Sequence, residues 1–452
     1  MDFLSSLIGP ESLLTGLRNV LAIRSDPLSF LSTLAHEGEI AYRRIGPYQA
    51  YLLNEPDHVR ELLVNHARSW KKGPLLQRSK HLLGEGLLTS EGEHHLRQRR
   101  LMQPLFYRQR LTRYAGLMVT CAEHCRNRWR DGAVLDVQEE MMRLTLAVVG
   151  KALFGEDFER DAVMISEAMR NLLAAANVRE EVLTLVLERL RLPDPAQRRL
   201  LYARQILAGV IQRLMAERQQ KGGEGEDLLS LLMTAHDTEG DGSTMSTTQL
   251  IDECITLLLA GHETTASALT FTFYLLAQHP HVEAKLHAEL SETLAGRLPD
   301  AEDIPQLSYT TQVFSEALRL YPPGWMMGRL LTTPVRIAGR DFATRELLIV
   351  SPYTMHRDSR FFPEPLLFQP ERFTPEAKAA RPKFAFFPFG AGPRQCIGEG
   401  FAWMEGTLLL ATLAQSFTLR LVPGPQVEPE ALLTLRPKNG ISMRVLRRSK
   451  LS

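Results

Sequence analysis

Residues 389–398 read FGAGPRQCIG, and this short stretch decides how the rest of the chain is interpreted. Two glycines and a proline precede Cys396, which predicts a tight, non-helical backbone. A helical pattern follows at residues 401–415, so Cys396 is expected just before a helix N-terminus. At such a position the helix dipole and the unpaired N–H groups favour a thiolate, which can bind a metal ion or act as a nucleophile. The alternative is a buried, inert cysteine.

The spacing within the stretch distinguishes between these alternatives. Five of its ten positions match the pattern F-x-x-G-x-R-x-C-x-G, namely Phe389, Gly392, Arg394, Cys396 and Gly398. This pattern resembles the haem-binding loop of the cytochrome P450 family, the haem-thiolate monooxygenases. The resemblance implies that Cys396 is the axial ligand of a b-type haem, where its electron donation favours O–O bond cleavage. The other matching residues are then expected to bind or enclose the haem.

Most of the remaining chain carries apolar residues at helical spacing, and a few segments alternate like strands. A hairpin is expected at residues 42–53, short strands at 335–350, and a second hairpin at 432–446 with its turn at Asn439-Gly440. The resemblance implies a mainly α fold with a small β region, as one triangular domain over residues 1–452. In that fold the haem lies between a long central helix and the helix after the cysteine loop.

The composition excludes several other classes of protein. The chain has 452 residues with 53 Lys+Arg and 52 Asp+Glu, and this balance argues against nucleic-acid binding. Four cysteines in a chain of this length exclude a disulfide scaffold. The first ten residues lack a basic segment, and no apolar run reaches the ~20 residues of a membrane span. We therefore expect neither a signal peptide nor a transmembrane anchor, but a soluble, cytoplasmic protein.

A long buried helix is predicted in the middle of the chain. Ser246 and Gln249 form a capping box, and Pro280 stops the helix after about Gln278. Within it, residues 260–265 read AGHETT. A glycine inside a helix costs about 1 kcal/mol relative to alanine, and threonine hydroxyls can bond back to the preceding turn. The helix is therefore expected to open locally, although small residues that let two helices approach would explain the same sequence.

The same hexapeptide resembles the A-G-x-E-T oxygen-activation motif of the P450 family. The resemblance implies that Ala260 borders the oxygen site and that Gly261 leaves room for dioxygen. Thr264 would hydrogen-bond the oxygen or a water beside it, and Glu263, charged and near solvent, would relay protons. His262 occupies the variable position of the motif, and we assign it no catalytic role.

Two further motifs predict a buried charge network. Glu316 and Arg319 stand three residues apart on one helix face, and residues 370–373 read PERF. They resemble the E-x-x-R helix and the P-E-R-F segment of the P450 family, which implies a triad of Glu316, Arg319 and Arg372. A buried acid between two guanidinium groups must be fully paired, so loss of one member should be severe. The expected role is structural, to lock the segment that leads to the cysteine loop.

Haem carries two carboxylates, which require cationic partners. His95 and Arg99 stand four residues apart and share a helix face. Their segment resembles the W-x-x-x-R helix of the P450 family, with His95 in place of the tryptophan. Arg329 and Arg394 are the other cations that the resemblance assigns to the haem. The alternative for this basic helix is an ordinary solvated surface.

Electrons are expected from separate proteins, because the chain has no glycine-rich dinucleotide motif and no room for a fused reductase. The resemblance implies a ferredoxin or a flavodoxin with its reductase, which would consume NAD(P)H. Arg97, Arg100 and Arg108 are expected to form a basic surface that steers such an acidic partner. The chain itself is expected to be a monomer.

The other three cysteines are interpreted as core residues. Cys121 and Cys125 stand four residues apart and could chelate a metal ion, but no second Cys or His pair completes a four-ligand site. Packing on an amphipathic helix explains both, and Cys254 fits the same interpretation.

The substrate is expected to be a large lipophilic molecule of the fatty acid, terpenoid or carotenoid class, because the segments that contact substrate in P450 proteins are apolar here. The expected pocket residues are Ala260, Trp325, Met326 and Met327. P450 analogy also assigns substrate contact to residues 70–88, 164–214, 324–327 and 438–441.

The sequence thus predicts an enzyme, similar to bacterial P450 proteins, that inserts one oxygen atom of O2 into a C–H or C=C bond. A hydroxylated or epoxidised product would result. The alternatives are a peroxide-driven peroxygenase, a haem isomerase, and a haem-based binding or sensor protein. The complete Glu263–Thr264 pair argues against each of them.

Overall fold

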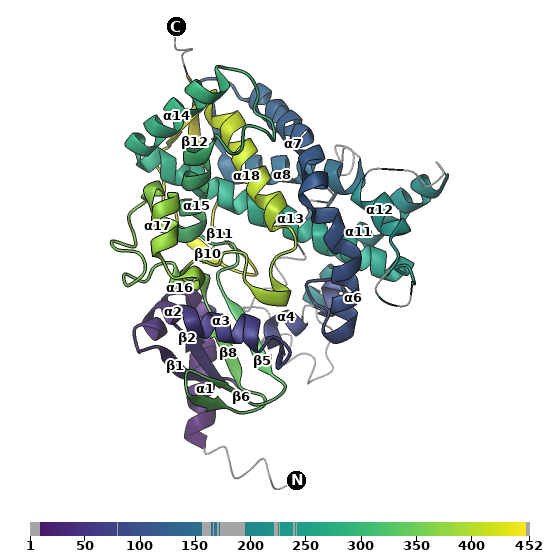
Figure 1. Ribbon diagram of the computed structural model, residues 1–452, viewed down its shortest axis with the longest axis vertical. Coiled ribbons are helices and arrows are strands. Elements are labelled where there is room, and N and C mark those ends of the chain that lie inside the picture. Colours follow the sequence, from purple (N-terminus) through teal and green to yellow (C-terminus); the bar gives the residue numbers. More distant parts are fainter. Residues whose placement is uncertain are drawn as a thin grey trace. The chain divides into compact units, whose positions relative to one another are not determined.

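The computed structural model describes residues 10–78, 80–155, 164–165, 167–169, 171, 195–220, 225, 227–237, 240 and 242–448 (Figure 1). The chain divides into two compact units of three segments each. The sheet unit comprises Met1–Arg78, Gly324–Leu367 and Ala379–Cys396, and the helical unit comprises Ser79–Pro323, Phe368–Lys378 and Ile397–Ser452. The chain therefore passes from the sheet unit to the helical unit directly after Cys396. The expected single domain over residues 1–452 stays a prediction.

The sheet unit contains a five-stranded mixed sheet in the order β1-β2-β8-β5-β3. Its strands are β1 (Ile40–Ile45), β2 (Tyr48–Leu53), β8 (Leu347–Val350), β5 (Met327–Leu331) and β3 (Trp70–Lys72). β1 and β2 form the hairpin predicted at residues 42–53, and Gly46 closes it with a φ of +56°. β2 and β8 run parallel, whereas β8–β5 and β5–β3 are antiparallel. β6 (Val335–Ile337) and β7 (Arg340–Phe342) form a further hairpin, so the predicted strands at 335–350 are confirmed.

Apolar side chains of the sheet and of the turn before β3 form the core of this unit. β8 has the sequence LLIV and all four residues are buried, as expected of a strand covered on both faces. The Tyr51 ring meets Phe342 edge-on, with 5.1 Å between the ring centroids. The helices of the sheet unit are α1 (Pro10–Ser25), α2 (Pro27–Ala35), α3 (Pro56–Arg60), α4 (Pro74–Arg78) and α16 (Pro352–Met355).

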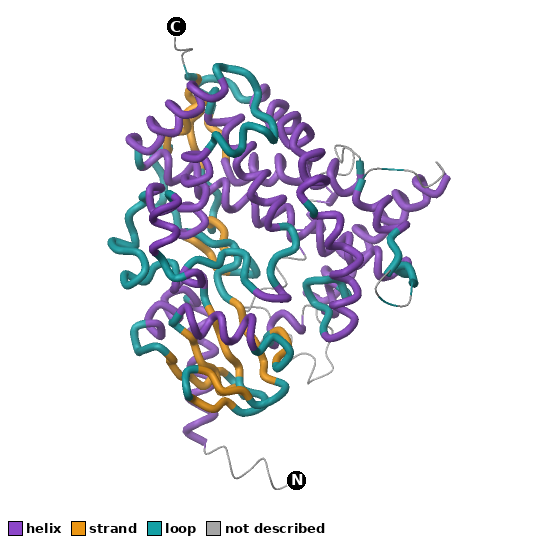
Figure 2. Tube along the Cα trace, in the orientation of Figure 1, coloured by secondary structure: helices purple, strands orange, loops and turns teal. Residues whose placement is uncertain are grey.

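The helical unit consists mostly of helices, with a few short strands (Figure 2). Its helices are α5 (Lys80–Leu83), α6 (Gly92–Met102), α7 (Arg108–Arg128), α8 (Val137–Phe154), α11 (Pro195–Gln220), α12 (Leu228–Thr234), α13 (Thr247–Gln278), α14 (Pro280–Leu294), α15 (Ser308–Leu320) and α18 (Glu399–Ala414). α17 (Pro375–Ala380) spans the point at which the chain leaves this unit. Among the described residues, none of the helices combines the length and the apolar character needed to cross a membrane.

α13 is the long helix predicted from its capping box. The Ser246 hydroxyl accepts a hydrogen bond from the Gln249 N–H, and the Gln249 side chain accepts one from the Ser246 N–H. The helix extends for 32 residues, packs along α8, and ends before Pro280 (Figure 1). It remains α-helical through residues 260–265, so the expected local opening is wrong. The reason is that the Thr264 hydroxyl donates to the Ala260 carbonyl at 2.6 Å and bridges that turn without breaking it.

The hairpin predicted at residues 432–446 is also wrong. β10 (Pro429–Ala431) and β11 (Leu435–Pro437) form a hairpin whose turn is at residues 432–434. β12 (Ser442–Arg447) instead pairs with β4 (Val134–Asp136) and β9 (Phe417–Leu421). Asn439-Gly440 therefore connects strands of two different sheets. Gly440 has a φ of +69°, and a Cβ there would lie 1.9 Å from the Asp136 carboxylate, so the glycine permits a close approach to β4.

Candidate active site

The cysteine loop belongs to the sheet unit, and its backbone is shaped by glycine. Gly390 and Gly392 have φ angles of +71° and +69°. A Cβ on Gly392 would lie 2.1 Å from the Leu63 carbonyl oxygen, so only glycine permits this close packing. The Cys396 N–H donates to the Phe389 carbonyl at 2.9 Å, which closes the loop. α18 begins three residues after Cys396, as the sequence predicts.

Cys396 is exposed, whereas the other three cysteines are buried. The Cys125 thiol lies 3.7 Å from Glu140, and burial raises its pKa to about 12. Burial likewise raises the pKa of Cys254. The described residues contain no group of three or more His, Cys, Asp or Glu that could hold a metal ion. These cysteines are packing residues, as predicted, and Cys396 is the accessible thiol.

One turn of α13 is accessible in a helix that is otherwise buried. Between residues 250 and 276, every residue is buried except Ala260, Gly261 and Thr264. Gly261 and Thr264 lie one and four positions after Ala260, so the three residues share one face of the helix. The largest of the three side chains on this face is that of Thr264. The A-G-x-E-T motif thus coincides with the accessible turn of α13.

Gly261 and His262 also connect α13 to α8. A Cβ on Gly261 would approach the Val149 side chain to 3.0 Å, so glycine allows the two helices to pack closely. The expected second role of Gly261, to leave room for dioxygen, stays a prediction. The His262 ring contacts the Met142 carbonyl at 2.9 Å, and the Thr145 hydroxyl donates to the His262 carbonyl. Burial lowers the pKa of His262 to about 4, so it is a neutral packing residue.

Glu263 does not lie near solvent, which corrects the expectation from the sequence. Its side chain is 2% exposed, and burial raises its pKa, while interactions with Thr434 and Arg436 act in the opposite direction. The Arg436 guanidinium lies 3.8 Å from the Glu263 carboxylate. Sequence reasoning missed Thr434 and Arg436, because they belong to no motif and stand about 170 residues from Glu263.

The structure brings Glu316, Arg319 and Arg372 together inside the helical unit. Arg319 donates to both carboxylate oxygens of Glu316, at 2.6 and 2.7 Å, and neither side chain is exposed. The Arg372 guanidinium lies 3.4 Å from the same carboxylate, which also accepts the Gln369 N–H at 2.9 Å. The network therefore attaches the Pro370–Phe373 turn to α15.

Glu405 on α18 is a buried acid that the sequence did not single out. Its side chain is fully buried, and burial raises its pKa to about 8, while interaction with Thr265 of α13 acts in the opposite direction. It is therefore a neutral acid near pH 7. A single glutamate in a mostly apolar helix, such as Glu405 before the residues GTLLLATLA, does not by itself indicate a functional acid. The helical pattern alone did not show which face of the helix Glu405 occupies.

The four cations expected at the haem carboxylates divide between the units. His95 and Arg99 lie on α6 of the helical unit, with His95 2% exposed and Arg99 half-buried. Arg329 and Arg394 belong to the sheet unit. The Arg329 guanidinium is buried and stacks 4.4 Å from the Trp70 ring, an interaction that the sequence did not predict.

The expected basic surface for a redox partner is only partly present. Arg100 makes two hydrogen bonds, of 3.0 and 2.8 Å, to the buried carboxylate of Asp237. Arg97 donates to the Ser243 hydroxyl and to the Thr244 carbonyl. These two arginines therefore already bind groups of their own unit. Arg108 is exposed, as predicted.

The expected substrate contacts of Trp325, Met326 and Met327 stay predictions. Trp325 is 4% exposed and its carbonyl accepts the Ser351 hydroxyl, so it is a core residue of the sheet unit, whereas Met326 and Met327 are half-buried. Residues 438–441 do not form a hairpin tip. The tip at 432–434 includes Leu433, which packs against the buried cluster that contains Leu258 and Leu259 of α13. Much of the segment 164–214 lies outside the described residues.

The family model for cytochrome P450 matches residues 9–444. The chain belongs to the cytochrome P450 family. A crystal structure of the cytochrome P450DA heme domain superposes with a TM-score of 0.83 at 26% identity, covering 94% of each chain. The predicted fold class, mainly α with a small β region, is thereby confirmed.

Three similar proteins come from Streptomyces. Cyclooctatin synthase of Streptomyces melanosporofaciens is 38% identical over 418 residues, which cover 92% of this chain and 91% of that protein. Cyclooctat-9-en-7-ol 5-monooxygenase of the same organism is 35% identical, with coverage of 90% and 88%. Pentalenene oxygenase of Streptomyces avermitilis is 34% identical, with coverage of 94% and 93%. The chain is accordingly a P450 oxidoreductase.

Membership of the P450 family implies a haem, and the residues present fit one. The sheet unit provides an accessible thiol in a glycine-shaped loop, and soft thiolate is a known haem ligand. The helical unit provides the accessible face of Ala260, Gly261 and Thr264 on an otherwise buried helix. Each unit thus offers one surface of the kind that a flat cofactor needs.

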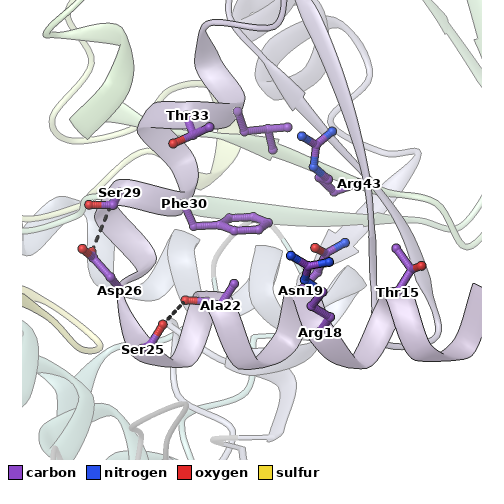
Figure 3. A pocket seen from close by; sticks show the side chains of 11 residues that line it. Thr15, Arg18, Asn19, Ala22, Ser25, Asp26, Ser29, Phe30, Thr33 and Arg43 are labelled. Carbon is purple, nitrogen blue, oxygen red and sulfur yellow. Dashed lines mark hydrogen bonds between the residues drawn. The ribbon is translucent and has the colours of Figure 1, made fainter.

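A separate pocket of about 500 Å³ lies in the sheet unit, lined by residues of α1, α2 and β1 (Figure 3). Its polar groups are engaged locally: the Ser29 N–H donates to Asp26, the Ser25 hydroxyl to the Ala22 carbonyl, and the Asn19 amide to the Arg44 carbonyl. None of its lining residues belongs to a motif described above. This pocket is not a candidate active site.

Proposed function

We propose that the chain is a haem-thiolate monooxygenase that hydroxylates or epoxidises a terpenoid. The observation that carries the proposal is the accessible Cys396 thiol, held by a glycine-shaped loop just before α18. Terpenoid is preferred to fatty acid or carotenoid because the Streptomyces relatives act on alkene or alkenol substrates according to their names. When bound, the haem would supply an iron centre that activates O2 with two electrons.

Cys396 would hold the iron through its Sγ. The loop keeps the thiol in place by its own hydrogen bonds, from the Cys396 N–H to Phe389 and from the Gln395 N–H to Gly392. The N-terminus of α18 follows directly, and its dipole favours the thiolate. His95, Arg99, Arg329 and Arg394 would bind the haem carboxylates.

Thr264 and Glu263 would move protons into the site. The Thr264 hydroxyl now donates to the Ala260 carbonyl, and rotation about its Cα–Cβ bond would redirect that donor to the accessible face of α13. Glu263 lies behind the same turn with its carboxylate shielded from solvent. It would take up a proton and pass it to the Thr264 Oγ through a water, acting as a general acid and returning to the carboxylate.

Ala260 and Leu433 would border an apolar substrate. Ala260 exposes only a methyl group on the accessible turn, and Leu433 is a half-buried leucine at the tip of the β10–β11 hairpin. Met326 and Met327 are half-buried and adaptable in shape, which suits an irregular hydrocarbon skeleton. The electrons would come from a ferredoxin or flavodoxin with an NAD(P)H-dependent reductase.

The first test is the carbon monoxide difference spectrum of the dithionite-reduced protein. We expect the strongly red-shifted Soret band of a thiolate-bound haem, and its loss in Cys396→Ala. A haem spectrum without that shift in the unaltered protein would refute thiolate ligation by Cys396.

A second test addresses the substrate class. Cyclic terpene alkenes are titrated into the haem protein beside fatty acids of equal carbon number. We expect a low-to-high spin shift of the haem with the terpenes. A shift with fatty acids alone would contradict the terpenoid assignment. Product formation driven better by peroxide than by a reductase would favour the peroxygenase.

A further inference from the structure

Glu263 has a partner that no motif of the sequence indicates. Its carboxylate is almost fully buried in the helical unit, and Arg436 lies 3.8 Å from its Oε1. Arg436 is on β11, directly opposite Glu430 of β10 in the hairpin register. The hairpin is anchored by a hydrogen bond from the Leu435 N–H to the Pro323 carbonyl, at 2.9 Å. The guanidinium is therefore held beside α13 by the hairpin backbone.

One guanidinium serves two carboxylates of different accessibility. The Arg436 Nη2 donates to the Glu430 Oε2 at 3.3 Å, and its Nη1 lies farther, 3.8 Å, from the Glu263 Oε1. The Glu430 side chain is 22% exposed and that of Glu263 is 2% exposed. The solvated carboxylate thus has the shorter contact, and the buried carboxylate, which needs the cation more, has the longer one.

We propose that Arg436 is a positioning residue that keeps Glu263 ionised and oriented, and that Glu430 limits this effect by drawing the same guanidinium toward itself. The proposal rests on the monooxygenase function, in which Glu263 is ionised between proton transfers, takes up a proton, and becomes ionised again when it delivers that proton. Thr434, in the turn of the same hairpin, interacts with Glu263 as well.

Other charged groups packed around α13 do not replace Arg436. His262 is neutral because burial lowers its pKa to about 4. From α18, Glu405 interacts with Thr265, and burial raises its pKa to about 8, so it contributes no charge near pH 7. The buried acids on α15 and at the start of α13 have their own partners, as shown by the Glu316–Arg319 and Asp252–Arg204 ion pairs.

The hairpin's position also links the acid to the substrate side. The turn that contains Thr434 includes Leu433, which packs against the cluster formed with α13. A shift of this turn would change the contact of Leu433 and the distance from Arg436 to Glu263 together. The protonation of Glu263 is thus tied to the same hairpin that would border the substrate.

The test is infrared spectroscopy of the haem-loaded protein, because it reads the carboxyl group directly. Subtracting the spectrum of Glu263→Gln from that of the unaltered protein isolates the C=O stretch of protonated Glu263. The band is recorded against pH. In Arg436→Gln we expect the proton affinity of Glu263 to rise about tenfold or more, since a cation near a buried carboxylate is lost. In Glu430→Gln we expect a shift in the opposite direction, because Arg436 is released to Glu263.

Two further variants complete the series. Arg436→Lys retains the charge and should restore most of the original titration. Arg420→Gln is the matched control, because Arg420 pairs with Glu283 at 3.0 and 2.6 Å between β9 and α14, away from Glu263. An unchanged midpoint in folded Arg436→Gln overturns the proposal. If that variant does not fold, an unchanged midpoint in Glu430→Gln overturns it instead.

The outcome is separable from that of the proposed function. The infrared titration reports the Glu263–Arg436 interaction whether or not the carbon monoxide spectrum shows a thiolate haem. In turnover, Arg436→Gln should release more peroxide per NAD(P)H than the unaltered protein, and Arg436→Lys should release less than Arg436→Gln. A purely structural role for Arg436 would leave the infrared midpoint unmoved.

Discussion

The cysteine loop of the sheet unit and the accessible turn of α13 are constructed in opposite ways. In the loop, positive φ angles at Gly390 and Gly392 and two backbone hydrogen bonds place an exposed thiol. In α13, the backbone is regular, and the turn is defined by side chains from α8 and the β10–β11 hairpin. The first region depends on conformation, and the second depends on pairing and packing.

The two regions should therefore tolerate different substitutions. A glycine-shaped loop fails when a Cβ is added, because no neighbour can move away from a backbone clash. A packed turn can accept a change that a second substitution compensates. The following predictions, from the largest to the smallest expected effect on stability, test whether this distinction holds.

Arg319→Ala should have the largest effect. It leaves the Glu316 carboxylate buried without its bidentate partner, which we expect to lower the free energy of unfolding by about 3–5 kcal/mol. Denaturant unfolding, together with the haem content of the purified protein, measures the loss. Arg336→Ala is the control, because the Arg336–Asp341 pair is exposed and should contribute less than about 1 kcal/mol. Equal losses of stability in both variants would show that the buried network stabilises the protein no more than an exposed ion pair does.

Gly392→Ala should be the next most harmful change. Its φ of +69° disfavours alanine by about 1–2 kcal/mol, and the new Cβ would clash with the Leu63 carbonyl. We expect lower stability and a reduced fraction of thiolate-bound haem in the carbon monoxide spectrum. Gly116→Ala on α7 is the matched variant, since nothing lies near its Cβ and it should stabilise the helix by about 1 kcal/mol. Normal haem binding by Gly392→Ala would mean that the loop is not shaped by this glycine.

Glu405→Gln should change how stability depends on pH. The folded protein holds the Glu405 proton up to about pH 8, whereas the unfolded chain releases it near the ordinary value of 4.5. Between these values the folded state binds more protons, so stability falls by about 1.4 kcal/mol for each pH unit of increase. The glutamine variant lacks this loss and should gain stability relative to the unaltered protein as pH rises. Parallel curves of unfolding free energy against pH would contradict a neutral, buried Glu405.

Gly261→Ala should cost less, because two effects oppose each other. Overpacking against Val149 costs about 1–3 kcal/mol, while alanine improves helix propensity by about 1 kcal/mol. We expect a net loss of about 1 kcal/mol, and a smaller loss when Val149→Ala is also present. Thermal unfolding of the two single variants and the double variant completes the cycle. If the stability changes of the two single variants simply add in the double variant, the loss in Gly261→Ala does not arise from the contact of Gly261 with Val149.

Thr264→Ala should have the smallest effect on stability, within about 1 kcal/mol, since it removes one hydroxyl from an accessible position. Its effect should be on coupling: more peroxide and less product for each NAD(P)H consumed, because proton delivery loses its hydroxyl. Thr264→Ser retains the hydroxyl and serves as the control. The amounts of NAD(P)H consumed, peroxide released and product formed are measured in the same reaction. An unchanged ratio of product to NAD(P)H in Thr264→Ala would show that Thr264 does not take part in proton delivery.

The sequence predicted those features that are encoded locally. The position of Cys396 before a helix followed from Gly390, Gly392 and Pro393, and the start of α13 followed from its capping box, because both signals lie within ten residues. The fold class was predicted from the resemblance of the cysteine-loop motif to the haem-binding loop of the P450 family. Local signals were misleading at Asn439-Gly440, where a dipeptide typical of hairpins connects two different sheets. Strand pairing depends on distant residues, and β12 found β9 and β4 instead of β11.

Apart from the triad of Glu316, Arg319 and Arg372, which two motifs indicated, contacts between distant residues could not be predicted. The burial of Glu263 depends on a hairpin about 170 residues away, and the motif gives no information on what covers its carboxylate. Arg97 and Arg100 read as a basic surface, yet Asp237 and a loop about 140 residues later bind both. Charge pairing of this kind depends on tertiary packing, which neither spacing nor composition records.

The segmented construction of the sheet unit has a consequence for synthesis of the chain. β3 ends at Lys72 and its neighbour β5 begins at Met327, with about 250 residues between them. At a synthesis rate of ~5–20 residues per second, β5 and β8 are made about 10–50 s after β1, β2 and β3. During that interval β2 and β3 have unpaired edges, and the segment that carries Cys396 emerges later still. The protein therefore completes its cysteine loop among the last steps of its production, after most of the helical unit has already been made.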